Sequence, residues 1–102
     1  MLVVLLASAV APAQSPLVAE LQTVATSYYN DPTRLDAIRN ALEQTIKTDS
    51  RVEHLVALAR VNFIWGDIRA PTDDQKLNAY DRGRRAAKRV IELQPSHVEA
   101  RF

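Results

Sequence analysis

The chain has 102 residues, 47% of them hydrophobic and 25% charged, which is enough for one small domain but not for two. Thirteen Lys and Arg residues against twelve Asp and Glu residues leave a net charge of +1, which excludes a strong electrostatic case for nucleic acid or an anionic membrane as the partner. The chain has no cysteine, which excludes disulfides, thiolate nucleophiles, cysteine-ligated zinc and a lipidated N-terminal cysteine, and its two glycines and five prolines favour helices over a turn-rich β fold.

The first segment, residues 1–13, is apolar, carries no charge and ends in Ala11-Pro12-Ala13. A short apolar run with small residues at its end is typical of a secretory signal peptide, and it is shorter than the roughly 20 apolar residues that a bilayer-spanning helix needs. It lacks the positively charged start of a signal peptide, so a buried N-terminal helix and an uncleaved anchor are alternatives. We expect residues 14–102 to form the folded domain and the protein to be periplasmic or otherwise exported.

Two helices are expected before residue 50. Asn30-Asp31-Pro32 ends the first and starts the second, with Asp31 as the N-cap and Pro32 at the first helical position, and the second helix runs to about Thr48. Apolar residues at spacings of three and four mark the inward face of each helix. They are Leu17, Val18, Leu21, Val24, Ala25 and Tyr28 in the first helix and Leu35, Ile38, Ala41, Leu42 and Ile46 in the second.

Two longer helices follow. Ser50-Arg51-Val52-Glu53 and Thr72-Asp73-Asp74-Gln75 both have the capping-box pattern, in which the two polar side chains each meet an unpaired backbone N–H. The third helix is expected to end at Gly66 in a left-handed conformation, and the fourth to run to about Leu93, before Pro95. The expected inward residues are Val52, Leu55, Val56, Leu58, Ala59, Phe63 and Ile64 in the third helix and Leu77, Tyr80, Ala87, Val90 and Ile91 in the fourth.

A helix-start pattern also occurs near the end of the chain. Ser96-His97-Val98-Glu99 repeats Ser50-Arg51-Val52-Glu53 at an offset of 46 residues, with three of the four residues identical. The three residues that follow are too few to form a helix of their own. We therefore expect the natural product to continue, and the helical array in this chain to be incomplete.

The third and fourth helices resemble a tetratricopeptide repeat (TPR), a helix-turn-helix unit that stacks into solenoids. The residues at the positions of the pattern are Leu55, Leu58, Ala59 and Asn62 in the first helix, Gly66-Asp67 at the turn, and Gly83, Ala87 and Pro95 in the second helix. The chain departs from the pattern at Asn62, where an aromatic residue is usual, at Gly83, where alanine is usual, and in a longer connection between the two helices. In such a unit, Ala59 and Gly83 let the two helices approach, while Leu55, Leu58 and Val90 fill the space between them. The expected fold is all-α: antiparallel helix hairpins stacked as a TPR-like superhelical array, about two helix pairs plus the start of a third. An ordinary amphipathic helix bundle is the alternative.

Residues 16–102 further resemble the TatT family, the periplasmic T-components of TPR-protein-associated TRAP transporters. The resemblance lies in the helix start at Asp31-Pro32, in residues 59–68, in residues 76–83 and in residues 92–102. It implies a non-catalytic exported protein that acts with a substrate-binding component of the transporter and handles a small apolar or carboxylate ligand. A generic TPR scaffold for protein–protein interaction is the alternative function.

Patterns typical of catalysis or metal binding are not found in the sequence. His54 and His97 are far apart in the chain and lack carboxylates at metal-ligand spacing, and the isolated glycines make no phosphate loop. Asp73-Asp74 is explained by the positive end of the helix that it begins. No serine has an orienting histidine and acid nearby in the sequence. We expect neither enzymatic activity, nor a cofactor, nor a metal.

Two surfaces are candidate binding sites. TPR geometry implies a ligand or partner groove lined by Glu53, Val56, Arg60, Phe63 and Ile64. A second candidate is a basic docking face of Arg82, Arg85 and Arg89, which share one side of the fourth helix and suit an acidic partner or a carboxylate ligand. For the arginines, the alternative is a solvated charged face. Trp65 is expected to pack in the core or between helices, with an exposed position in the groove as the alternative.

Overall fold

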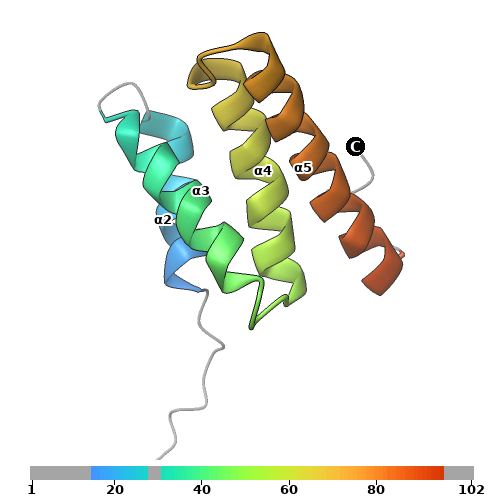
Figure 1. Cartoon of the computed structure of the whole chain (residues 1–102). Coiled ribbons are helices and arrows are strands. Elements are labelled where there is room, and N and C mark those ends of the chain that lie inside the picture. Colours follow the sequence, from blue (N-terminus) through green and yellow to red (C-terminus); the bar gives the residue numbers. More distant parts are fainter. Residues whose placement is uncertain (1–14, 28–30, 96–102) are drawn as a thin grey trace, which may run out of the picture.

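The computed structural model describes residues 15–27 and 31–95, and the elements within these ranges are all α-helices. Successive helices run in opposite directions (Figure 1). Within the described ranges no helix has the length and apolar character to cross a membrane. The expected signal peptide, Tyr28 and the helix start at residues 96–99 lie outside the described residues. The helices are α2 (Pro16–Ser27), α3 (Thr33–Thr45), α4 (Val52–Ile68) and α5 (Asp73–Leu93).

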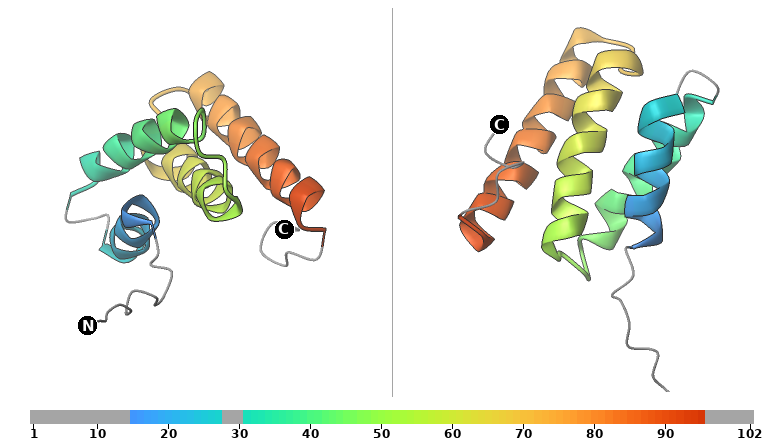
Figure 2. Two further views of the ribbon diagram at one scale, coloured as in Figure 1. Left: turned by 90° about the horizontal axis from the view of Figure 1, so that it is seen from below. Right: turned by 180° about the vertical axis from the view of Figure 1, so that it is seen from behind.

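Helix α4 is the centre of the fold, because it packs against each of the other three helices. Seen from below, α2 and α3 lie on one side of α4 and α5 lies on the other (Figure 2). The inward stripes predicted for the first two helices are buried in part, with Leu17, Ala25, Ala41 and Ile46 half-buried. Fully burying one Leu or Ile stabilises the fold by about 1.5–3 kcal/mol. The main buried stripes are Val18, Leu21 and Val24 of α2, Leu35, Ile38 and Leu42 of α3, and Ala57, Leu58 and Val61 of α4.

Helices α4 and α5 approach closely through two glycines. A Cβ atom on Gly66 would lie 2.7 Å from the Tyr80 ring, and one on Gly83 would lie 2.7 Å from the Phe63 ring. The prediction that Gly66 ends the third helix is wrong: it lies inside α4, and the described glycines have no positive φ. Its role is to make room for a neighbouring helix rather than to reverse the chain.

The buried face of α5 is displaced around the helix from the predicted one, and Tyr80, Ala87 and Ile91 are half-buried. Ala79, Gly83, Ala86 and Val90 are buried, whereas Leu77, predicted to face inward, is 65% exposed. Because each helical residue turns the chain by about 100°, Leu77 lies about 200° around the axis from Ala79. The buried stripe therefore faces α4 with small residues, which suits close packing.

The starts of the helices differ in part from the predicted ones. Pro32, rather than Asp31, is the N-cap of α3, and the Asp31 carboxylate accepts a hydrogen bond from the Thr33 hydroxyl (2.7 Å). Helix α3 ends at Thr45, and the next three residues continue as a turn. Pro32 already has helical dihedral angles, so by its backbone conformation the helix begins at Pro32, as predicted. By its hydrogen bonds the helix begins one residue later, at Thr33.

The predicted capping box at residues 50–53 is wrong, and the one at residues 72–75 is confirmed in its Thr72 half, while the Gln75 side-chain oxygen accepts from the Thr72 hydroxyl. Helix α4 has Arg51 as its N-cap, without a side-chain capping bond, and the Glu53 carboxylate accepts from the Arg51 guanidinium instead. The shift of one residue leaves Glu53 too early in the helix to reach back to the cap. At α5, the Thr72 hydroxyl oxygen accepts from the Gln75 backbone N–H at 3.1 Å.

Candidate functional site

A groove of about 490 Å³ lies between α3 and α5, with residues of α4 at its base. Its volume is within the range of about 300–1,000 Å³ that is usual for small-molecule sites. We call it the arginine groove. Its lining residues are Glu43, Ile46, Ser50, Leu55, Leu58, Asn78, Arg82, Arg85, Ala86 and Arg89.

The base of the arginine groove is apolar. Leu55 and Leu58 of α4 and Ala86 of α5 are buried, and Ile46, just after α3, packs partly buried against them. Apolar surface of this kind favours a ligand with a hydrocarbon body, because binding removes that body from water. Leu55, Leu58 and Ile46, but not Ala86, were predicted to face inward, and nothing in the sequence indicated that these residues line a groove.

The α5 wall of the groove is cationic. Arg82, Arg85 and Arg89 lie at spacings of three and four, which puts them on one flank of the helix. The structure thus brings together all three residues of the predicted basic face, and Arg84 and Lys88 are not part of the lining. Three guanidinium groups above an apolar base suit a ligand that carries both a carboxylate and an apolar body.

The three arginines have different acidic partners. Arg85 Nε lies 2.9 Å from an Asp81 oxygen, and Arg89 pairs with Glu92 at 3.7 Å, so both pairs lie along α5 itself. Arg82 instead reaches across the groove to α3, where its Nη1 lies 3.0 Å from Glu43 Oε2. Exposed ion pairs of this kind contribute only about 0–1 kcal/mol, so a ligand carboxylate competes with them readily.

Glu43 also interacts with a second cation on α3. Burial lowers the pKa of Arg39, the Glu43 carboxylate opposes that shift, and the positive charge of Arg82 adds to it. Glu43 is therefore within electrostatic reach of both Arg39 and Arg82. This carboxylate is a candidate functional residue that the sequence analysis did not identify, because nothing local links it to α5.

The predicted TPR groove is divided between two places. A hollow of about 200 Å³ between α2 and α4 contains three of its five residues, Glu53, Val56 and Arg60. Phe63 lies over Gly83 against α5, and Ile64 packs on the main core. The residues that complete the α2–α4 hollow are Val18, Leu21, Gln22, Val52 and Ala57.

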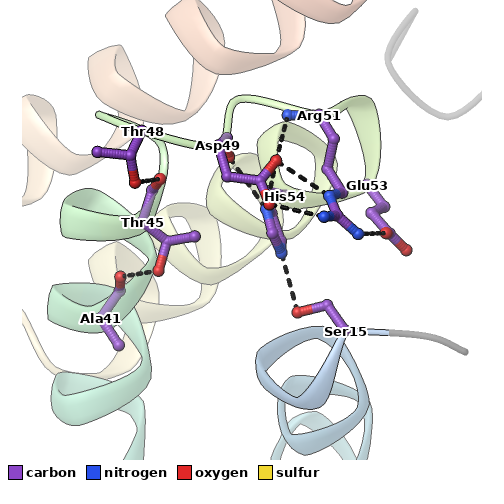
Figure 3. Close-up of polar contacts among 8 residues, drawn as sticks. All are labelled: Ser15, Ala41, Thr45, Thr48, Asp49, Arg51, Glu53 and His54. Carbon is purple, nitrogen blue, oxygen red and sulfur yellow. Dashed lines mark hydrogen bonds and ion pairs between the residues drawn. The ribbon is translucent and has the colours of Figure 1, made fainter.

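A buried polar cluster joins the beginning of α2 to α4 (Figure 3). His54 Nδ1 donates to the Asp49 backbone carbonyl at 3.0 Å, and in the neutral ring Nε2 accepts from the Ser15 hydroxyl at 2.9 Å. The sequence analysis missed this pair because the two residues are 39 positions apart. We call it the Ser15–His54 clamp.

Ser15, His54 and Asp49 are also the residue types of a nucleophile, a base and an acid. However, Ser15 is 9% exposed and His54 is 4% exposed, and neither lines the arginine groove or the α2–α4 hollow. The Asp49 carboxylate lies 3.7 Å from the ring and is held by the Arg51 guanidinium at 2.7 and 3.0 Å. What the geometry shows for these groups is a contact that joins the start of α2 to the start of α4.

A second polar network holds α3 against α4. The Asp36 carboxylate accepts from Trp65 Nε1 at 2.7 Å and from two nitrogens of Arg69, and the hydrogen bond with Arg69 is the largest cause of a lowered pKa for Asp36. The guanidinium of Arg39 stacks on the Trp65 ring at 4.1 Å and donates to Asn62 at 2.7 Å. Trp65 therefore packs between helices rather than lining a groove.

The described part of the chain has no candidate metal site. Among the described residues, no three His, Asp or Glu side chains are grouped so that they could hold a metal ion. No protein-family model matches the chain, and no curated protein and no solved structure matches it significantly. The arginine groove is therefore interpreted from its own residues and geometry.

Proposed function

We propose that this protein is a non-catalytic, exported binding protein of the TPR type, whose arginine groove takes a ligand with an apolar body and a carboxylate. The observation that carries the proposal is the cationic flank of Arg82, Arg85 and Arg89 beside a buried apolar base. Each half of such a ligand finds its chemical complement: hydrocarbon on the leucines and carboxylate on the guanidiniums.

We further propose that the protein is a TatT-like component of a TRAP transporter system, which passes its ligand to or from a solute-binding partner. The sequence resemblance supports this assignment. The order of the helices supports it as well, because the antiparallel pairs α2/α3 and α4/α5 pack side by side in the manner of helix-hairpin repeats. The apolar and anionic ligand expected from the groove is also the class that the resemblance implies.

The test compares two neighbouring arginines that share one partner. Arg85 and Arg84 both pair with Asp81, but only Arg85 lines the arginine groove. Decanoate, kept below its micellar concentration, should raise the Tm of the full chain saturably, whereas decanol at equal concentration should do so much less. Arg85→Gln should weaken decanoate binding by about tenfold in calorimetry, because a charge-assisted hydrogen bond is lost, and Arg84→Gln by less than about twofold.

Two results would overturn the proposal. If decanoate does not bind the wild-type chain at any submicellar concentration, the proposal that the groove takes a carboxylate ligand fails. Equal losses in the Arg85 and Arg84 variants would mean that the arginines act only through the net charge of α5, and that the groove is not the site.

A further inference from the structure

One contact in the arginine groove differs from the others because it spans the groove. The Arg82–Glu43 pair joins α5 to α3 across 39 residues of sequence, whereas Arg85 and Arg89 pair with acids on their own helix. The groove therefore already holds one carboxylate against one of its arginines. That carboxylate has the same chemistry as the head group of the proposed ligand.

Glu43 is also well placed to imitate a bound head group. Its side chain is 21% exposed, compared with 48% for Arg82, and it lies in the groove lining together with the apolar base. A sheltered carboxylate beside apolar side chains and in contact with a guanidinium is the arrangement that a bound hydrophobic acid would have. Two carboxylates do not share one such position, because like charges at close range repel.

Displacing Glu43 does not leave it without a cation. Arg39 lies one helical turn before it on α3, a spacing at which side chains meet, and the charges of these two residues already interact. Arg39 itself is held in place by Asn62 and by the ring of Trp65. Arg82 can thus exchange one carboxylate for another while Glu43 turns from Arg82 to Arg39, and each charge keeps a partner.

We propose that Glu43 is a built-in competitor, whose carboxylate occupies Arg82 in the empty groove and is replaced there by the carboxylate of the ligand. The inference rests on the proposed function, since it assumes that the arginine groove binds a carboxylate. It assigns Arg82 as the head-group position and Glu43 as the residue that sets the affinity. An uncharged ligand of the same length gains nothing from this exchange and is not affected by Glu43.

The test is a double-mutant cycle on the full chain, with decanoate binding measured by calorimetry. Glu43→Gln should tighten binding by about tenfold, because the competing charge is gone. In the Arg82→Gln background the same change should have less than about a twofold effect, because the contested position no longer exists. Glu20→Gln, the same charge change on α2 outside the groove, is the matched control and should leave the affinity within about twofold of wild type.

The outcomes separate the two proposals. If neither the wild-type chain nor the Glu43 variant binds decanoate, the proposed function fails, and the inference fails with it. If the wild-type chain binds but Glu43→Gln does not tighten binding, the inference alone is overturned. A gain that persists in the Arg82→Gln background also overturns it, because Glu43 then acts only as a distant negative charge. Circular dichroism checks that each variant keeps its helix content.

Discussion

Asn62 shows how single polar residues determine the way in which the helices meet. It is fully buried, yet its amide nitrogen donates to the Leu58 carbonyl at 2.9 Å and its oxygen accepts from Arg39 at 2.7 Å. A buried amide without these partners would cost about 1–3 kcal/mol. Asn62 thereby positions the arginine that stacks on Trp65.

The prediction at the residue scale is that the contribution of Asp36 to the free energy of unfolding depends on pH. Its pKa is lowered below the ordinary 3.8, chiefly by the hydrogen bond from Arg69. A lowered pKa in the folded state adds stability above the unfolded value, and that stability is lost as the pH falls through the folded value. Asp36→Asn should therefore reduce the free energy of unfolding at pH 7 by about 1 kcal/mol, a figure already discounted for solvent screening.

Urea denaturation from pH 7 downward checks this sign. The difference between wild type and Asp36→Asn should shrink once the pH is below about 4, where the unfolded carboxylate is protonated. Arg69→Gln and the double variant complete a cycle whose coupling should decline over the same range. A coupling that stays constant down to the lowest pH would mean that the charge of Asp36 is not what joins α3 to the end of α4.

At the scale of elements, α4 and α5 pack together where a glycine of one helix faces an aromatic ring of the other. Gly83 faces Phe63, and Gly66 faces Tyr80, about one turn later in α4 and about one turn earlier in the antiparallel α5. Leu55 and Val90 pack together at the opposite end of the same pair. The sequence analysis paired Gly83 with Ala59, but the side chain nearest to Gly83 is Phe63. A small residue predicts that something lies close to it, and the partner depends on how the two helices are aligned.

The prediction at this scale is that the effect of Gly83→Ala on the free energy of unfolding reverses its sign when the Phe63 ring is removed. Gly83→Ala in the wild-type chain should lower the free energy of unfolding by about 1 kcal/mol, because the cost of displacing the Phe63 ring exceeds the gain in helix propensity. In a Phe63→Ala background the same change should raise it by about 1 kcal/mol, since the methyl group then fills vacated space. Chemical denaturation of the four proteins measures both values. The same effect in both backgrounds would refute the ring contact.

At the scale of the whole molecule, α2 packs less extensively than the central helix α4 in the part of the chain that the structure describes. Helix α4 packs against α2, α3 and α5, whereas α2 is attached through its apolar stripe, the Ser15–His54 clamp and the Glu20–Arg34 ion pair with α3. A helix at the edge of a fold can open locally without unfolding of the whole molecule. We therefore expect α2 to open before the α4–α5 pair does.

The whole-molecule prediction uses Ser15→Ala, which leaves His54 Nε2 without its partner in a buried position. Hydrogen exchange should become about tenfold faster in α2, corresponding to a loss of about 1.4 kcal/mol, with α5 unchanged. Thr26→Ala, an exposed change in the same helix, should leave exchange in α2 nearly unaffected. Equal acceleration in α2 and α5 would show instead that the molecule opens as one unit.

The features that depend on local periodicity could be predicted from the sequence. The all-α content, the buried stripes such as Leu35-Ile38-Leu42 and the shared flank of Arg82, Arg85 and Arg89 all follow from 3.6 residues per turn. The capping box at Thr72 is likewise a contact within four residues. Such features were predictable because the interacting residues are neighbours in the chain.

Which helix faces meet, and what lies between them, depends on contacts between residues that are distant in the chain. The wrong end predicted at Gly66 and the wrong face predicted for Leu77 both reflect the position of a neighbouring helix. The Ser15–His54 clamp and the Arg82–Glu43 pair each join residues 39 positions apart. Periodicity specifies which residues share a helix face, but the helix that packs against that face is determined by packing across the whole molecule. The arginine groove arises from that packing, and so does the position of the Glu43 carboxylate inside it.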